Sequence, residues 1–510
     1  MTISPQDFHD AWNRLIGPNG YAMEGLRKTG VPGMAIAVVY QGQPYYACVG
    51  TRDLALGDQA PVDVNTVFPL ASLSKPITST ILAYEVTRWL AGGWNTPVGT
   101  LDPSYKVDDR VSIASLLAHR SGLIDHAGDL LEDLGFTRER ILQLITTLPT
   151  WPHLSIAPYA CDFAYTNFGF SEAAFAVARL LKQQWEDVGH AFFQTHGMSS
   201  TSYRYADFLE RGNAVKSYQR TPVPRADHEP LPPNPKWFAP AQRRNPDAQS
   251  PAGGVTSSVS DLIPWMMLNL RAQPVPPGLN DNLRYAHSPY PGPDKMNYGM
   301  GWKIGKEDAA LGVTLGHSGA FLLGAATCVS LLPEHDLGIV ALTNGQPIGL
   351  PEAICHQFAY DVTNHPGRTS FEETLDYAAK LIQGELYPVP DPDYSRPPTA
   401  PKSPIAHPSE YTGTYFNDYY QGVTISGSNT VHDPFVMQAG PEGERFVLTP
   451  YEGLTFTFPT TGENANGLSA VTFRVDPPGH VQAIVVHHFT MPDANDGLTL
   501  KPGLFKKRPG

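Results

Sequence analysis

The hydrophobic pattern of the first three quarters of the chain alternates between strands and helices. Apolar runs of β-favouring residues, separated by glycine, proline or polar turns, predict strands at 33–40, 44–50, 313–315, 325–332 and 338–343. The short turn at 41–43 makes the first two a β-hairpin. Helical patterns occur at 76–90 and 170–184, and Pro76 suits a first turn, where its missing N–H costs little. We expect an α/β (α+β) domain, with an antiparallel sheet flanked by helices and an all-α insertion between Ser72 and the late strands.

The strongest change of composition is a proline-rich stretch from Tyr387 to Pro408, YPVPDPDYSRPPTAPKSPIAHP. Proline fixes φ and removes an N–H donor, so this stretch predicts an extended linker. We therefore expect domains at 1–390 and 409–510, joined by a linker at 391–408. Two further segments rich in proline and polar residues, 221–251 and 271–296, predict long loops, which are either walls of a site or solvated insertions.

The region after the linker carries short runs rich in Thr, Val, Phe and Tyr, without a helical pattern. These runs lie at 411–416, 422–426, 445–449, 454–458, 470–475 and 481–489. Turn residues separate them, which predicts a small all-β module, a barrel or a sandwich. His487 and His488 are adjacent, and neighbours on a strand point to opposite faces, so we do not expect them to form a metal site.

Composition and charge exclude several classes of function. The 510 residues include 36 Lys and Arg against 49 Asp and Glu, a net charge of −13, which argues against binding to nucleic acid or to an anionic membrane. No apolar run approaches the ~18 residues of a membrane span, and Met1 to Asp10 lacks the features of a secretion signal. The 4 cysteines are far apart, which favours reduced core thiols over a disulfide or a metal site. We expect a cytoplasmic protein.

A candidate nucleophile stands at the start of the predicted helix, in the sequence FPLASLSK. Ser72 and Lys75 are three residues apart, so on a helix they share a face. A serine hydroxyl is a weak nucleophile until a base takes its proton, and a lysine amine can act as that base. The helix N-terminus adds free N–H groups where an oxyanion would develop. Such a motif also arises by chance as a helix cap followed by a surface lysine.

Two later motifs complete a possible site. Tyr165 and Asn167 lie in FAYTNFGF, where a phenol can carry a proton and an amide can orient its neighbours. His317 and Gly319 lie in TLGHSGAFLLG at the end of a strand pattern, and the glycine allows close approach of the backbone. The Ala320 N–H can then complete an oxyanion hole opposite the Ser72 N–H.

These three motifs, in this order, resemble the penicillin-recognising serine hydrolases. The resemblance covers about residues 10 to 385 and points to the branch with class C β-lactamases, D-aminopeptidases, D,D-carboxypeptidases and related esterases. Stretches that match this branch are Val31 to Gly33, IASLLAHRSGL at 113–123, PAGGVTSSVSD at 251–261, YGMGW at 298–302 and Thr343-Asn344-Gly345. The last domain resembles the lipocalin-like barrels attached to some of these hydrolases, where the barrel can border the active site or build an oligomer.

The resemblance implies a serine β-lactamase-like domain and a role for each motif. Ser72 would be the acylated nucleophile, with Lys75 and Tyr165 in proton transfer, and which of the two is the acylation base stays open. Asn167, Gly319 and Ala320 would bind substrate, and His317 would occupy the third motif. The reaction would form an acyl-enzyme and then hydrolyse it. No cofactor or metal is implied, the partner is a small ester, amide or peptide, and a homo-oligomer is compatible with the sequence.

The third motif departs from the pattern of most β-lactamases. His317 stands where they carry lysine, and a neutral histidine is a weaker anchor for a substrate carboxylate. This favours hydrolysis of esters or small amides, with D-aminoacyl peptides among the candidates, over efficient hydrolysis of β-lactams. A Lys-Thr-Gly does occur at Lys28-Thr29-Gly30, but it precedes Ser72 and ends a helix pattern, so it predicts a helix C-cap.

Other functions compete with this interpretation. Residues 316–320 also fit a loose nucleophile elbow around Ser318, but the residues that follow resemble a strand and not the helix that an α/β-hydrolase requires. A D,D-carboxypeptidase, a penicillin-binding protein without turnover and an acyltransferase share the acyl-enzyme. Ser72, Lys75 and Tyr165 together argue against a mere binder, which has no need of all three.

Overall fold

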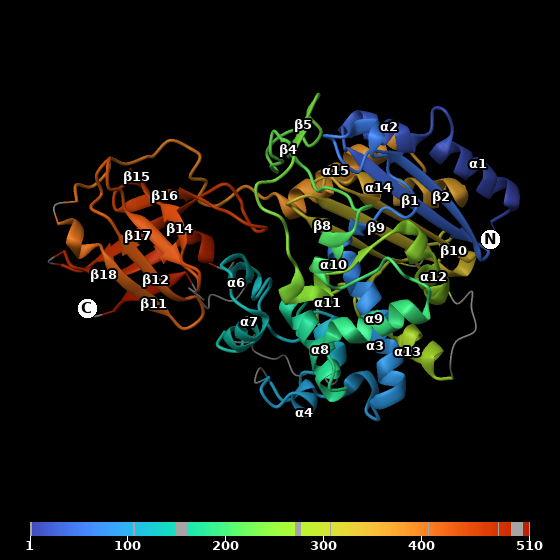
Figure 1. Cartoon of the computed structure of the whole chain (residues 1–510), viewed down its shortest axis with the longest axis horizontal. Helices are drawn as coiled ribbons and strands as arrows, with labels where there is room; N and C mark the ends of the chain where they lie inside the picture. Colours follow the sequence, from blue (N-terminus) through green and yellow to red (C-terminus); the bar gives the residue numbers. More distant parts are fainter. Residues whose placement is uncertain are drawn as a thin grey trace. The chain divides into compact units, whose positions relative to one another are not determined.

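The computed structural model describes residues 3–105, 108–148, 161–270, 277–306, 308–405, 407–477, 479–490 and 503–508 (Figure 1). Two compact units divide the chain. The first comprises Met1–Gly122 and Trp151–Pro388, and the second comprises Leu123–Thr150 and Val389–Gly510. The second unit thus includes a segment that interrupts the first, and no pattern in the sequence indicates this grouping. The domain limits expected around 391–408 stay a prediction.

An antiparallel sheet forms the centre of the first unit. Its strand order is β2-β1-β10-β9-β8-β7. The strands are β1 (Gly33–Tyr40), β2 (Gln43–Gly50), β7 (Lys303–Ile304), β8 (Leu315–Phe321), β9 (Ala325–Leu332) and β10 (Leu337–Thr343). The predicted hairpin is confirmed, because β1 pairs with β2 from Gly33 opposite Gly50 to Tyr40 opposite Gln43. The third predicted strand, 313–315, begins later and is longer than expected.

Helices cover both faces of this sheet. The side chains of β1 are apolar on both faces, so each face packs against helices. Met34, Ile36 and Val38 join a core with α1 (Pro5–Ile16), α2 (Tyr21–Thr29) and α14 (Leu350–Val362). The alternate side chains of β1 point the other way, as the period of a strand requires, and α12 (Val259–Asn269) packs there. A fourth helix, α15 (Phe371–Leu386), packs on α14.

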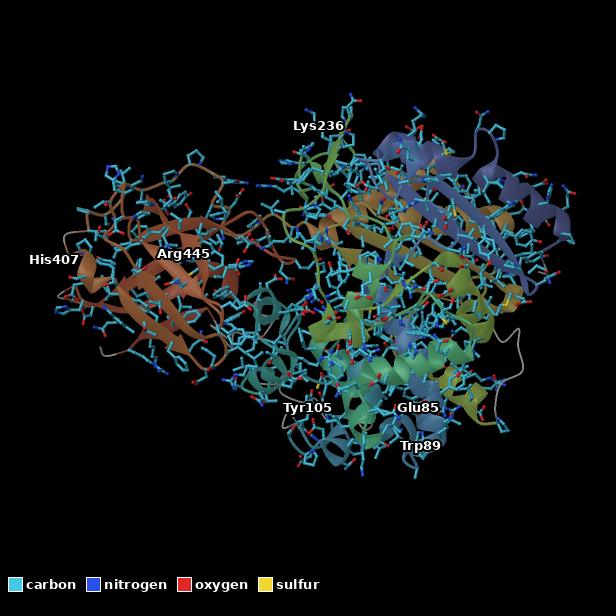
Figure 2. The ribbon with its side chains drawn as sticks, in the orientation of Figure 1. Glu85, Trp89, Tyr105, Lys236, His407 and Arg445 are labelled. Carbon is cyan, nitrogen blue, oxygen red and sulfur yellow. The ribbon has the colours of Figure 1, made fainter. Side chains whose placement is uncertain are left out.

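The remaining elements of the first unit include the predicted helical insertion. They are α3 (Ser74–Trp89), α4 (Val98–Leu101), α5 (Ile113–Leu117), α8 (Asn167–Leu180), α9 (Trp185–Thr195), α10 (Tyr205–Glu210), α11 (Ser250–Gly253), α13 (Leu279–Ala286), β3 (Phe68–Pro69), β4 (Gln219–Thr221), β5 (Lys236–Phe238) and β6 (Thr256–Ser257). The segments expected as long loops thus hold β5 and α13. The exposed Lys236 lies on β5, and the exposed Trp89 ends α3 (Figure 2).

The second unit is the predicted all-β module with two added helices. Nine strands follow the order β14-β13-β12-β11-β19-β18-β17-β16-β15. They are β11 (Gly413–Asn417), β12 (Gln421–Ser426), β13 (Val436–Ala439), β14 (Glu444–Val447), β15 (Thr449–Glu452), β16 (Thr455–Pro459), β17 (Leu468–Val475), β18 (Val481–Val486) and β19 (Leu504–Lys507). The edge strands β14 and β15 are joined by Leu448 alone, so the sheet is nearly closed into a barrel. The helices are α6 (Asp129–Asp133) and α7 (Arg138–Ile145).

His487 and His488 do not lie on a strand as expected. They open a single 3-10 turn, His487–Phe489, and both are half-buried. Cys328 and Cys355 are buried, and Cys48 and Cys161 are half-buried. No helix among the described residues combines the length and the apolar character that crossing a membrane requires.

Candidate active site

Ser72 lies in a 3-10 turn, Ala71–Leu73, directly before α3. The preceding residue, Ala71, has a φ of 49°, a left-handed conformation that residues other than glycine rarely adopt. A distant segment of the chain stabilises this turn, because the Leu70 N–H donates to the Val255 carbonyl over 2.8 Å. The Val255 N–H in turn donates to Ser74 Oγ over 2.9 Å. Ser72 itself is only half-buried, so its hydroxyl is within reach of a substrate.

Lys75 follows Ser72 by one turn and is fully buried. Its Nζ donates to Ser72 Oγ over 3.0 Å, to Asn167 Oδ1 over 2.7 Å and to the Ala252 carbonyl over 3.1 Å. These three acceptors match the three N–H groups of a lysine ammonium. The arrangement therefore fits a positively charged Lys75 beside the serine.

Tyr165 approaches the serine from a segment without regular secondary structure, just before α8. Its hydroxyl lies 2.9 Å from Ser72 Oγ. The Lys75 ammonium lies 4.5 Å from the centre of the Tyr165 ring, and Asn167 begins α8 two residues later. The structure thus gathers Ser72, Lys75, Tyr165 and Asn167 as the sequence indicated. One group was missed, the Ala252 carbonyl, although its stretch PAGGVTSSVSD was noted as a family match.

His317 is buried on β8 and both of its ring nitrogens are engaged. Nδ1 lies 2.6 Å from the Ser318 carbonyl, which only accepts, so Nδ1 carries the proton. Burial, and then the nearby cations Lys303 and Lys75, hold the pKa of His317 well below its usual value. The neutral ring therefore accepts at Nε2 from the Tyr298 hydroxyl, 2.9 Å away. His317 bonds to these partners and not to Ser72.

Gly319 brings β8 against the turn that carries the serine. A Cβ at this position would lie 2.1 Å from the Leu70 carbonyl oxygen and 2.3 Å from Thr327 Oγ1. Only glycine permits this approach, which brings β8 against the 3-10 turn that carries Ser72. The Ala320 N–H as second donor of an oxyanion hole stays a prediction.

Two residues that sequence reasoning left without a role lie around this cluster. His119 packs its ring on Tyr165, and Tyr298 holds His317. Both belong to stretches noted as family matches, LLAHRSGL and YGMGW, but their partners come from distant parts of the chain. Within the described ranges, no group of three His, Cys, Asp or Glu side chains is arranged to hold a metal ion.

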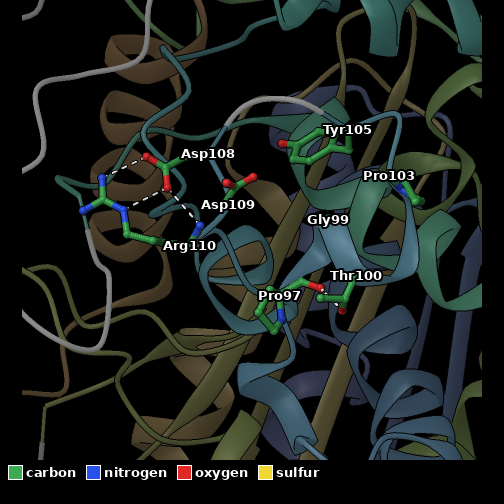
Figure 3. Close-up of a pocket in the computed structure, with 8 residues that line it drawn as sticks. All are labelled: Pro97, Gly99, Thr100, Pro103, Tyr105, Asp108, Asp109 and Arg110. Carbon is green, nitrogen blue, oxygen red and sulfur yellow. Dashed lines mark hydrogen bonds and ion pairs between the residues drawn. The ribbon is translucent and has the colours of Figure 1, made fainter.

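A separate hollow of about 880 Å³ lies around α4 (Figure 3). Its lining falls between Pro97 and Arg110, and the Arg110 guanidinium donates there to both carboxylate oxygens of Asp108. None of its lining residues belongs to the cluster around Ser72. This hollow is therefore not the candidate site.

Comparisons with known proteins agree with the predicted family. The family model described as Beta-lactamase matches residues 20–362. The chain is 23% identical over 444 residues to the unguisins hydrolase ungD of Aspergillus violaceofuscus (strain CBS 115571), covering 79% of this chain and 75% of that protein. A shorter match, 38% identical over 85 residues, covers 17% of this chain and 20% of the beta-lactamase of Escherichia coli (strain K12).

Solved structures resemble the chain in fold. A class C beta-lactamase aligns with a TM-score of 0.54 at 18% identity, covering 71% of this chain and 97% of its own. The class C beta-lactamase from Rhodobacter sphaeroides aligns with a TM-score of 0.53 at 18% identity, covering 70% and 99%. At this identity the likeness concerns the fold alone, an antiparallel sheet flanked by helices.

Proposed function

The chain belongs to the beta-lactamase family and has its fold, and we propose that it hydrolyses esters or small amides through an acyl-enzyme on Ser72. One observation carries the proposal. Ser72 Oγ lies 3.0 Å from Lys75 Nζ and 2.9 Å from the Tyr165 hydroxyl, at an accessible position. A nucleophile in contact with a phenol that can carry its proton and with an amine that can carry a positive charge is an arrangement suited to acyl transfer.

We assign the acylation base to Tyr165. Lys75 has its three donors engaged by three acceptors, so it acts as a fixed positive charge. That charge, 4.5 Å from the Tyr165 ring, stabilises the ionised phenol. The phenolate oxygen takes the Ser72 proton as Oγ attacks the substrate carbonyl carbon, and then gives this proton to the departing alcohol or amine.

The second half of the reaction reverses these roles. Water attacks the acyl carbon, Tyr165 takes the proton of the water, and Ser72 Oγ leaves and regains a proton. The Ser72 and Ala320 N–H groups are the donors we assign to the developing oxyanion. Gly319 supports this assignment, because its contact with the Leu70 carbonyl keeps β8 beside the serine turn.

The third motif supports substrates without a carboxylate. His317 is held uncharged by burial and by its bonds to Tyr298 and the Ser318 carbonyl. It therefore offers no cation for the carboxylate of a β-lactam or of a C-terminal peptide. Esters and amides that lack a carboxylate, with D-aminoacyl amides among them, are the favoured class. The relative named as a hydrolase, which matches 79% of this chain, favours turnover over mere binding.

A substrate panel with Ser72→Ala tests the proposal. The wild type should turn over p-nitrophenyl esters or aminoacyl anilides many times, and more slowly a chromogenic cephalosporin, while Ser72→Ala should lose at least about 10³-fold in kcat. Wild-type rates in Ser72→Ala would show that Ser72 is not the nucleophile. Release of one equivalent of product per protein molecule would indicate a binder without turnover. Faster release of product in the presence of an added alcohol would indicate an acyltransferase.

A further inference from the structure

His119 contacts three consecutive residues around the proposed base. It is fully buried just after α5. Its carbonyl accepts the Ala164 N–H over 2.9 Å, and its Nδ1 accepts the Thr166 N–H over 3.2 Å. Between these two bonds, its ring lies on the Tyr165 ring, with centroids 4.3 Å apart. The contacts thus reach the backbone on both sides of Tyr165 and the side chain itself.

These contacts matter because Tyr165 lies in a segment without regular secondary structure. Residues 161–166 form neither helix nor strand, and α8 begins only at Asn167. The phenol must nevertheless stay within hydrogen-bond distance of Ser72 Oγ, since proton transfer depends steeply on that separation. The backbone bonds to His119 replace the hydrogen bonds that a strand or a helix would have supplied.

The His119 ring also reaches the third motif. Its centroid lies 5.2 Å from that of Tyr298, the residue that donates to His317. His119 therefore contacts both the proposed base and the residue that donates to His317 on β8. A change of its volume displaces both together.

We propose that His119 is a positioning residue that holds the Tyr165 phenol against Ser72. The inference rests on the proposed function. Few residue types meet the demands of this position. Its backbone is left-handed, with a φ of 58°, a conformation in which histidine and asparagine are enriched among non-glycine residues. It also needs a side-chain acceptor for Thr166 and an aromatic face for Tyr165, and histidine supplies all three.

Three variants separate these demands. His119→Asn keeps the backbone preference and an acceptor but loses the ring, His119→Phe keeps an aromatic ring but loses the acceptor, and His119→Ala loses both. We expect kcat for a p-nitrophenyl ester to fall about 3- to 10-fold in His119→Asn and about 10- to 100-fold in the other two, because small displacements of a reacting group are that costly. KM should change less than about 3-fold, since His119 touches no substrate.

The matched control is His287→Asn. His287 is also buried, but it bonds to Asn269 over 3.0 Å and packs on Trp302, which lie on α12 and in the YGMGW stretch. Its replacement should lower stability and leave kcat per folded molecule unchanged, with the folded fraction measured by titration of Ser72 with a fluorophosphonate. If His119→Ala and His119→Phe do not fold, the fall of kcat in His119→Asn alone tests the proposal.

Wild-type kcat in folded His119→Asn, or a rise of KM that accounts for the whole loss of kcat/KM, would overturn the proposal. A loss of kcat equal to that in His287→Asn would do the same. These results are distinct from failure of the proposed function. If Ser72→Ala keeps turnover, the nucleophile is wrong; if Ser72→Ala is inactive and His119 variants are not impaired, only the positioning role is wrong.

Discussion

Gly319 is the residue at which the strand and the serine turn meet most closely. A Cβ there would lie 2.1 Å from the Leu70 carbonyl oxygen and 3.0 Å from the Leu73 nitrogen. Gly319→Ala must therefore push β8 away from the turn, and we expect kcat/KM to fall about 100-fold together with a lower melting temperature. Gly212→Ala is the control, because no atom lies within 4 Å of a Cβ at Gly212. Equal activity of the two variants would show that the contact is dispensable.

The predictable part of the site is the part fixed by short spacing. Lys75 follows Ser72 by three residues at the start of a helix, so their contact follows from helical geometry. The role of His119 depends on a left-handed backbone and on partners 45 to 47 positions away, which no local pattern contains. The state of His317 likewise depends on Tyr298, which comes from an irregular loop. The sequence identified His317 by its motif but gave His119 and Tyr298 no role, because only the fold brings these partners together.

Among the elements, α8 links the site to a buried carboxyl group with charged neighbours. Asn167 begins this helix beside Lys75, and Glu172 lies buried five residues later against Arg179 and Asp102. Burial raises the pKa of Glu172 to about 8, with Arg179 opposing and Asp102 adding to the rise. Glu172 therefore holds a proton in the folded protein at neutral pH and gives it up on unfolding.

The sign of the pH dependence follows from this proton. Because the folded pKa lies above the unfolded one, the contribution of Glu172 to stability is complete below about pH 4.5 and is lost as the pH rises through about 8. The slope from one such group is at most about 1.4 kcal/mol per pH unit. Glu172→Gln is neutral at every pH and keeps a donor for Asp102. Its free energy of unfolding should therefore fall less with rising pH than that of the wild type.

Urea denaturation at pH 6 and pH 8 measures this slope. The wild type should lose more free energy of unfolding between the two values than Glu172→Gln. Glu373→Gln is the control, because hydrogen bonds from Ser370 lower the pKa of Glu373, which therefore titrates below this window. If Glu172→Gln and wild type decline equally, Glu172 is ionised in the folded protein.

The fold elements were predictable where the chain forms long apolar runs and less so where strands are short. The expected strands at 33–40, 325–332 and 338–343 correspond to β1, β9 and β10, which are almost wholly buried. In the second unit, β13 (Val436–Ala439), β15 (Thr449–Glu452) and β19 (Leu504–Lys507) were missed, since four residues give a period little room to appear. The equally short β14 was found only because it lies within the longer apolar run 445–449. His487 and His488 were placed on a strand that in fact ends at Val486.

At the scale of the whole molecule, the second unit is assembled from two distant parts of the chain. The segment that carries α6 lies between motifs of the first unit in sequence, yet its contacts are with the barrel. The Gly128 N–H donates to the Tyr419 hydroxyl over 2.8 Å, and Asp133 accepts from the Glu463 and Asn464 N–H groups. The barrel is therefore tied to a chain segment inserted between Ser72 and Tyr165, and is not merely a C-terminal appendage.

Asp133 tests whether this tie stabilises the barrel. Its carboxylate accepts the Glu463 N–H over 3.1 Å and the Asn464 N–H over 2.9 Å, and a third bond comes from the Asn464 side chain. Asp133→Ala leaves these donors without their acceptor, and each such loss costs about 1 to 3 kcal/mol. We expect faster hydrogen exchange in β16 and β17, the strands on either side of this turn. The exposed Glu139 of α7 provides the control, Glu139→Ala, whose barrel should exchange as in the wild type. Equal exchange in both variants would mean that the barrel is stable without the inserted segment.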